Sequence, residues 1–180
     1  MSVITRRGDD GQTDFMFGRR CSKNSLRVQA YGDVDELTSA LGMARALGLS
    51  AKAAELVDTV QTHLIGLMGE LATMPEDMPE YHRRGYAGIE PKDVRWVEAQ
   101  AEALEKQGHI HFTGWVKPGK DAPPAAAALD LARAICRRAE RSALALHEQE
   151  PLCNKSILIF LNRLSDLLWL AARYESSPQS

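Results

Sequence analysis

The chain has 180 residues, of which 44% are hydrophobic and 26% charged, and its formal net charge at pH 7 is -2. This length and composition are typical of a single globular domain with a hydrophobic core. The nearly neutral charge argues against nucleic acid or an anionic membrane surface as the main partner.

The cysteines and the hydrophobic segments indicate the compartment. Three cysteines lie far apart and form no CxxC pair, which is typical of reduced thiols. The chain start lacks the apolar stretch of a secretory signal. The most hydrophobic segment, SILIFLNRLSDLLWLAA, is interrupted by polar residues and should not span a bilayer. We therefore expect a cytoplasmic protein with no membrane partner.

The chain opens on a polar, glycine-rich segment, TRRGDDGQT, from Thr5 to Thr13. On composition alone, a disordered lead-in is the ordinary interpretation of such a segment. A P-loop is excluded, because the GxxxxGK[ST] spacing is absent and no obvious strand precedes the segment.

Strand signals are almost absent, whereas a helical period of about 3.6 residues recurs along the chain. Five helices are expected, at about 27–47, 51–73, 91–106, 124–147 and 154–174. Ser50 is a suitable N-cap for the second helix, and Pro91 suits the first turn of the third. The segment 74–90 contains prolines and glycines and is expected to be a surface loop. Long helices with short links predict an all-α antiparallel bundle in one domain.

The last expected helix is apolar around most of its circumference. Only Asn162, Asp166 and Arg173 form a narrow polar strip. Such a helix is either central in the fold or packed against a second chain, and we expect a subunit interface. If Asn162 is buried it must be hydrogen-bonded, either within the core or to a ligand.

The segment ARAICRRAER carries the strongest chemical signal. Arg133, Arg137 and Arg141 recur at four-residue spacing on one side of the expected helix, where like charges repel. One interpretation is an ion-pair network with Asp130 and Glu140 as local partners. The other is a polyphosphate site, because guanidinium groups match phosphate oxygens bidentately.

The segment YGDVDELTSALG places Asp33, Asp35 and Glu36 in the first turns of the first helix. Carboxylates are favourable there because the helix N-terminus carries partial positive charge, although one of them could instead pair with an arginine of the 124–147 helix. His109 and His111 supply too few ligands for a metal site, and no HExxH or paired ExxH pattern is present. No nucleophile with its base is recognised.

Four segments occur in the order TRRGDDGQT, SKNSLRVQAYGDVDELTSALGMARA, ARAICRRAERSALAL and LNRLSDLLWLAARYE. Together they resemble the PduO-type ATP:cob(I)alamin adenosyltransferases over most of the chain. The resemblance implies a five-helix bundle that assembles as a homotrimer, with active sites between adjacent subunits. Residues 1–26 would form an ATP-binding loop, 27–175 the bundle and 176–180 a flexible tail.

The implied reaction is attack by Co(I) of a reduced corrinoid on C5′ of ATP, giving adenosylcobalamin and tripolyphosphate, with Mg²⁺ accompanying the triphosphate. The cofactor carries the nucleophile, which explains why the sequence offers none. A flavin reductase and an adenosylcobalamin-dependent mutase are the further partners that the resemblance suggests. An ATP-binding sensor or carrier without corrinoid chemistry, and a helical interaction module whose arginines only form ion pairs, are the alternatives.

The resemblance also implies roles for single residues. Asp35 would pair with Arg133 across the subunit boundary, and these two would form the catalytic set with Arg137 and Asn162. The residues implied to bind ATP are Thr5, Arg6, Arg7, Gly8, Thr13, Asp14, Lys23, Arg137, Glu140, Arg141 and Asn162.

The corrinoid side departs from the family pattern. In WVKPGK, Trp115 stands where the family has the phenylalanine that displaces the lower axial ligand, so Trp115 is expected to contact the corrinoid. Asp130 stands at the usual histidine position, and Lys117 and Lys120 are further departures.

Overall fold

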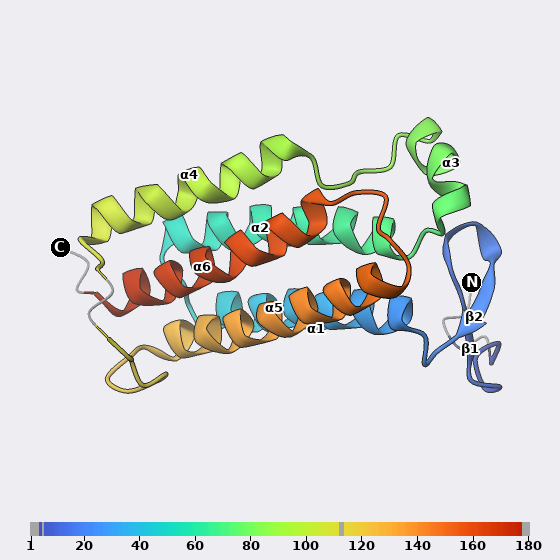
Figure 1. Ribbon diagram of the computed structural model, residues 1–180. Coiled ribbons are helices and arrows are strands. Elements are labelled where there is room, and N and C mark those ends of the chain that lie inside the picture. The colour runs from blue at the N-terminus through green and yellow to red at the C-terminus, as the bar shows by residue number, and fades with distance from the viewer. Residues whose placement is uncertain (1–3, 5, 112–113, 178–180) are drawn as a thin grey trace.

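The computed structural model describes residues 4, 6–111 and 114–177. Within this part of the chain, long helices form an elongated bundle with a small β-hairpin at one end (Figure 1). The long helices are α1 (Leu26–Ala46), α2 (Ala51–Leu71), α4 (Pro91–Gly108), α5 (Pro124–Gln149) and α6 (Ser156–Ser176). The short elements are β1 (Gln12–Asp14), η1 (Met16–Gly18), β2 (Arg20–Ser22), η2 (Pro75–Asp77) and α3 (Met78–Arg83).

The helices pack side by side around one core. α1 packs against α5 and α2, α5 also packs against α6, and α6 packs against α4. α1 leads away from the hairpin and α5 returns toward it (Figure 1). Leu37, Leu64, Leu129 and Phe160 come from four different helices and are all fully buried. The prediction of a mostly helical fold is confirmed.

The local signals at the helix ends act as expected. The Ser50 side chain caps α2 by accepting from the backbone N–H of Ala53 at 3.4 Å. Pro91 occupies the first turn of α4, preceded by a capping box in which Glu90 and Asp93 accept from each other's backbone N–H groups. α4 ends at Gly108, and the residue that follows it, the C-cap His109, has a left-handed φ of 46°. α6 continues to Ser176, into the segment expected to be a tail.

Two short features were missed by the sequence analysis. The N-terminal segment holds the antiparallel strands β1 and β2, with Thr13 opposite Cys21. The segment 74–90, predicted as a loop, contains η2 and the six-residue helix α3. Tyr81 anchors α3, because its side chain is buried and its hydroxyl donates to the Ala87 carbonyl at 2.6 Å. Burial raises the pKa of Tyr81 to about 12. Both features are too short for a periodic signal.

The apolar circumference of the last helix is largely covered within the chain, so it does not support the expected subunit interface, which stays a prediction. α6 lies between α4 and α5, which together cover most of its apolar circumference. Leu161, Leu164 and Leu168 are fully buried within the chain. Ile159 is the large apolar side chain of α6 that stays exposed, at 48%. The helix is therefore central in the fold.

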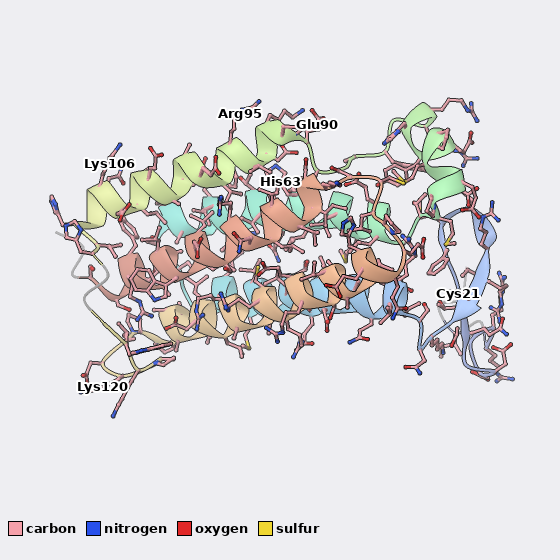
Figure 2. The ribbon with its side chains drawn as sticks, viewed as in Figure 1. Cys21, His63, Glu90, Arg95, Lys106 and Lys120 are labelled. Atoms are coloured by element: carbon pink, nitrogen blue, oxygen red, sulfur yellow. The ribbon has the colours of Figure 1, made fainter. Side chains whose placement is uncertain are left out.

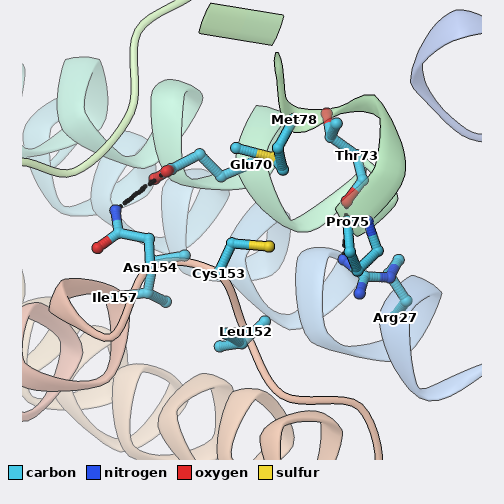
Figure 3. Close-up of a pocket in the computed structure, with 9 residues that line it drawn as sticks. All are labelled: Arg27, Glu70, Thr73, Pro75, Met78, Leu152, Cys153, Asn154 and Ile157. Atoms are coloured by element: carbon cyan, nitrogen blue, oxygen red, sulfur yellow. Dashed lines mark hydrogen bonds between the residues drawn. The ribbon is translucent and has the colours of Figure 1, made fainter. Parts of the chain in front are cut away.

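A buried carboxylate fastens the turn between α5 and α6 to α2 (Figure 3). Glu70 on α2 is 6% exposed and accepts from the backbone N–H of Ile89 at 2.8 Å. The Asn154 amide donates to Glu70 at 3.0 Å and to the Ile89 carbonyl at 2.7 Å. Gly88 permits this arrangement, since a Cβ there would lie 2.6 Å from the Glu70 carboxyl carbon.

Gly88→Ala is expected to lower the free energy of unfolding by about 1–3 kcal/mol, because the new methyl group displaces a buried, hydrogen-bonded carboxylate. Gly42→Ala is the matched control, since its nearest contact would be the flexible Gln61 amide at 3.5 Å. The control should gain about 0.5–1 kcal/mol from helix propensity. Urea unfolding of both variants measures the difference, and equal stabilities would contradict the role assigned to Glu70.

Candidate functional site

A cavity of about 440 Å³ lies beside the first half of α5. It is walled by charged side chains from α5 and α6 and by two indole rings. These residues are Asp130, Arg133, Arg137, Arg173, Trp115 and Trp169. Trp115 itself is fully exposed.

Asp130 is the buried charge of this cavity, with its side chain 4% exposed. It pairs with Arg173 of α6, and the Arg133 Nε lies 3.7 Å from its carboxylate. The Arg173 guanidinium in turn lies 5.8 Å from the centre of the Trp169 ring. A buried carboxylate is costly unless cations compensate it. For Arg133, therefore, the ion-pair interpretation with Asp130 holds.

Arg137 and Arg141 are in a different situation. Both are exposed, and among the described residues neither has a carboxylate within 4.0 Å. The Arg141 side chain donates to the Arg137 carbonyl at 2.9 Å. Glu140, the other expected partner, instead accepts from the Asn162 amide at 3.1 Å. The predicted ATP residues Glu140 and Asn162 are thus brought together, and Asn162 is half-buried rather than enclosed in the core.

The carboxylates of α1 pair with an arginine that the sequence analysis did not single out. Arg138 lies 3.2 Å from Asp33 and also pairs with Glu36. The spacing of the arginines carried no signal for this pair, because the pair depends on how α1 and α5 are aligned. Asp35 is exposed and, within the described chain, forms no ion pair with Arg133.

The N-terminal residues predicted to bind ATP lie around the β-hairpin. Thr5 falls outside the described residues. Arg6 and Arg7 are exposed, and Arg7 pairs with Asp14 at 2.9 Å. The Lys23 ammonium donates to the Gly8 carbonyl at 2.7 Å. Gly8 is suited to this contact, since a Cβ there would lie 2.7 Å from the Lys23 nitrogen.

Arg20 organises the same loop and was missed. Its guanidinium donates to Asp10 at 3.1 Å and to the Arg7 carbonyl at 2.9 Å, and it lies 3.4 Å from Asp14. The signal that could have found Arg20 is the strand register, which places it opposite Asp14.

The two halves of the predicted site do not meet within one chain. The hairpin packs at the C-terminal end of α5, where Phe15 and Cys21 line a cavity with Gln149. Arg137 lies twelve residues before Gln149, or about 18 Å along the helix. Figure 2 shows Cys21 of the hairpin and Lys120 of the segment before α5 at opposite ends of the molecule.

The described residues contain no group of three or more His, Cys, Asp or Glu side chains that could hold a metal ion. Among these same residues, no helix is long and apolar enough to cross a membrane.

The three cysteines differ in their surroundings. Cys136 lies on α5 between the arginines, is fully buried, and donates from Sγ to the Leu161 carbonyl at 3.4 Å. Burial raises the pKa of its thiol. Burial also raises the pKa of Cys21, which is half-buried, whereas Cys153 is exposed.

These features define a helical-bundle protein with two exposed arginines on α5 that have no carboxylate partner among the described residues. Residues 3–175 match the family described as cobalamin adenosyltransferase. The chain is 36% identical over 178 residues to the corrinoid adenosyltransferase of Bacillus subtilis, covering 96% of this chain and 86% of that protein. It is 33% identical over 178 residues to the corrinoid adenosyltransferase PduO of Salmonella typhimurium, covering 98% of this chain but only 50% of that protein.

A solved structure is similar over the whole fold. It is a variant PduO-type ATP:corrinoid adenosyltransferase from Lactobacillus reuteri, complexed with cobalamin and ATP. The TM-score is 0.85 at 33% identity, and the match covers 96% of this chain and 92% of that one. The chain therefore belongs to the PduO-type cobalamin adenosyltransferase family, and the resemblance recognised in the sequence is confirmed.

The thiols should differ in reactivity, because the thiolate is the reactive form and access limits the rate. In the native protein Cys153 is expected to react first with a thiol reagent and Cys21 more slowly. Cys136 should react only after unfolding. Labelling followed by peptide mass spectrometry, with and without denaturant, checks this order, and native labelling of Cys136 as fast as Cys153 would contradict the packing of α5.

Proposed function

We propose that this protein transfers the 5′-deoxyadenosyl group of ATP to the Co(I) of a reduced corrinoid, giving adenosylcobalamin and tripolyphosphate. Membership of the family and the likeness to a structure complexed with cobalamin and ATP support this function. The observation that carries it in this chain is the pair Arg137 and Arg141, which are exposed on α5 and have no carboxylate partner in the part of the chain that the structure describes. Guanidinium groups left free in this way are available to phosphate oxygens.

The chemistry fits the residues present. The electron pair of Co(I) forms the bond to C5′, and the C5′–O bond breaks with its electrons leaving on the triphosphate. The nucleophile belongs to the corrinoid, so the protein needs no activated serine or cysteine. Its tasks are to orient the two substrates and to neutralise the charge that develops on the leaving group.

In this proposal ATP is bound by residues from both halves of the site. The N-terminal loop contributes its backbone and side chains to one side of the ATP site. These residues are Thr5, Arg6, Arg7, Gly8, Thr13, Asp14 and Lys23. From the bundle come Arg137, Arg141, Asn162 and Glu140. Mg²⁺, when bound, would be held through the ATP phosphates and would neutralise part of their charge.

We further propose that the protein is a homotrimer whose active sites are shared between neighbouring subunits. The distance between the hairpin and Arg137 within one chain supports a shared site. The exposed side of α5 also carries Leu144, which is 44% exposed and lies three residues, or about one helical turn, after Arg141. Exposed apolar side chains grouped with functional residues are typical of a subunit interface. Asp35 of one subunit would then reach Arg133 of the next.

The corrinoid is proposed to lie at the cavity of Trp115. The fully exposed indole of Trp115 offers the lower face of the corrin ring an aromatic surface in place of its axial ligand. Arg133 and Arg137 line the same cavity, so a corrinoid at Trp115 would lie close to two residues of the proposed catalytic set.

The function is tested with cob(I)alamin and ATP under strong, anaerobic reduction, by following loss of the Co(I) absorbance and appearance of the Co–C chromophore. Arg137→Ala should lower kcat/KM by about 100-fold or more, because a group that stabilises the leaving phosphate is lost. Its melting temperature should be unchanged, since Arg137 is exposed and pairs with no carboxylate among the described residues.

Arg138→Ala is the matched control on the same helix. It removes the contacts to Asp33 and Glu36, so the free energy of unfolding should fall by about 1 kcal/mol. Its activity should stay within about threefold of the wild type. A different outcome would favour the sensor or carrier instead: ATP raises the melting temperature of the wild-type protein, but no adenosylated corrinoid is formed under strong reduction.

The shared site is tested by mixing two inactive variants. In Lys23→Ala the loop is defective but Arg137 is intact, and in Arg137→Ala the reverse holds. If each site combines the loop of one subunit with α5 of its neighbour, random co-expression should restore about a quarter of the wild-type activity. Activity no higher than that of either variant alone would place both halves in a single subunit, and sedimentation equilibrium gives the number of chains.

A further inference from the structure

A second cavity, of about 330 Å³, adjoins the cavity of Trp115. It lies where the segment after α4 meets the end of α6. Gly114, Val116, Trp169 and Arg173 line both cavities, which therefore share a wall. The proposed function uses the first cavity and leaves the second without a role.

The second cavity combines an aromatic surface with nitrogen donors. His109 and His111 line it and are both exposed. The left-handed backbone of His109, with φ of 46°, turns the chain as it leaves α4. Trp169 supplies an indole ring, and Arg173 supplies a guanidinium held in place by Asp130. An aromatic ring accepts a stacked heterocyclic base, and a guanidinium binds phosphate oxygens.

The charge of the shared wall limits the anion that it suits. Among the described residues that line the second cavity, Arg173 is the only arginine or lysine. A triphosphate carries several negative charges and would need more cations nearby. A phosphodiester carries a single negative charge and fits this balance.

We propose that the second cavity binds the nucleotide tail of a complete corrinoid, that is, its heterocyclic base and phosphodiester-linked ribose. This inference rests on the proposed function, in which Trp115 takes the place of the lower axial ligand. The base released from cobalt stays tethered to the ring, and the adjoining cavity lies next to Trp115. The cavity thereby selects complete cobalamin over a corrinoid that lacks the tail.

The test compares cobalamin with cobinamide, which has the same ring and no nucleotide. The variant is His109→Asn with His111→Gln, since both side chains are exposed and the asparagine tolerates the left-handed backbone. With ATP present, its Kd for cob(II)alamin should rise about three- to tenfold, because contacts to the tail are lost. Its Kd for cob(II)inamide should change by less than about twofold.

Lys120→Gln is the control, because Lys120 is exposed in the same segment and lines neither cavity. It should leave both Kd values unchanged. An equal rise for the two corrinoids in the histidine variant, or no rise for either, would overturn the tail site. A weaker affinity for ATP alone would show that the cavity serves the triphosphate, which also overturns it. Failure of the proposed function is seen separately, as absence of adenosylated product from the wild-type protein with both corrinoids.

Discussion

The close packing of α5 between α1 and α6 is the constraint on which the other features depend. The inward side of α5 is a stripe of small residues, and Ala132, Cys136, Ala139 and Ala143 are all fully buried. Small side chains allow neighbouring helices to approach closely. Because this stripe faces the core, the arginines that alternate with it are directed to the margins and the outer surface. The same contacts enclose α6, whose apolar circumference is used within the chain.

Packing also determines which arginines of α5 have a carboxylate partner. Arg133 is compensated by the buried Asp130, and Arg138 by the carboxylates of α1. Arg137 and Arg141 stay exposed and without a carboxylate partner among the described residues. Two of the four thus stabilise the fold, and two are left for an anionic ligand. The ion-pair interpretation therefore holds for Arg133, and phosphate binding by Arg137 and Arg141 stays a proposal.

The sequence predicted the long helices well and the short elements poorly. Periodicity over many residues placed α1, α2, α4, α5 and α6 to within a few residues of their ends, because each helix presents a long apolar stripe to the core. The strands β1 and β2 and the helix α3 are too short to show a period. For α6 the sequence was ambiguous for another reason, since an apolar circumference does not reveal whether the neighbouring helix belongs to the same chain.

By itself, the sequence determined the helical class, the helix caps, the family and the types of residue at the candidate site, because these follow from local patterns along the chain. Only the tertiary structure decided that Asp130 joins Arg133 to Arg173, that Asp33 pairs with Arg138, and that the hairpin lies far from Arg137. The physical reason is that such contacts depend on the register between helices distant in sequence. Side-chain packing between the helices determines that register, so it cannot be predicted from the sequence of one segment alone.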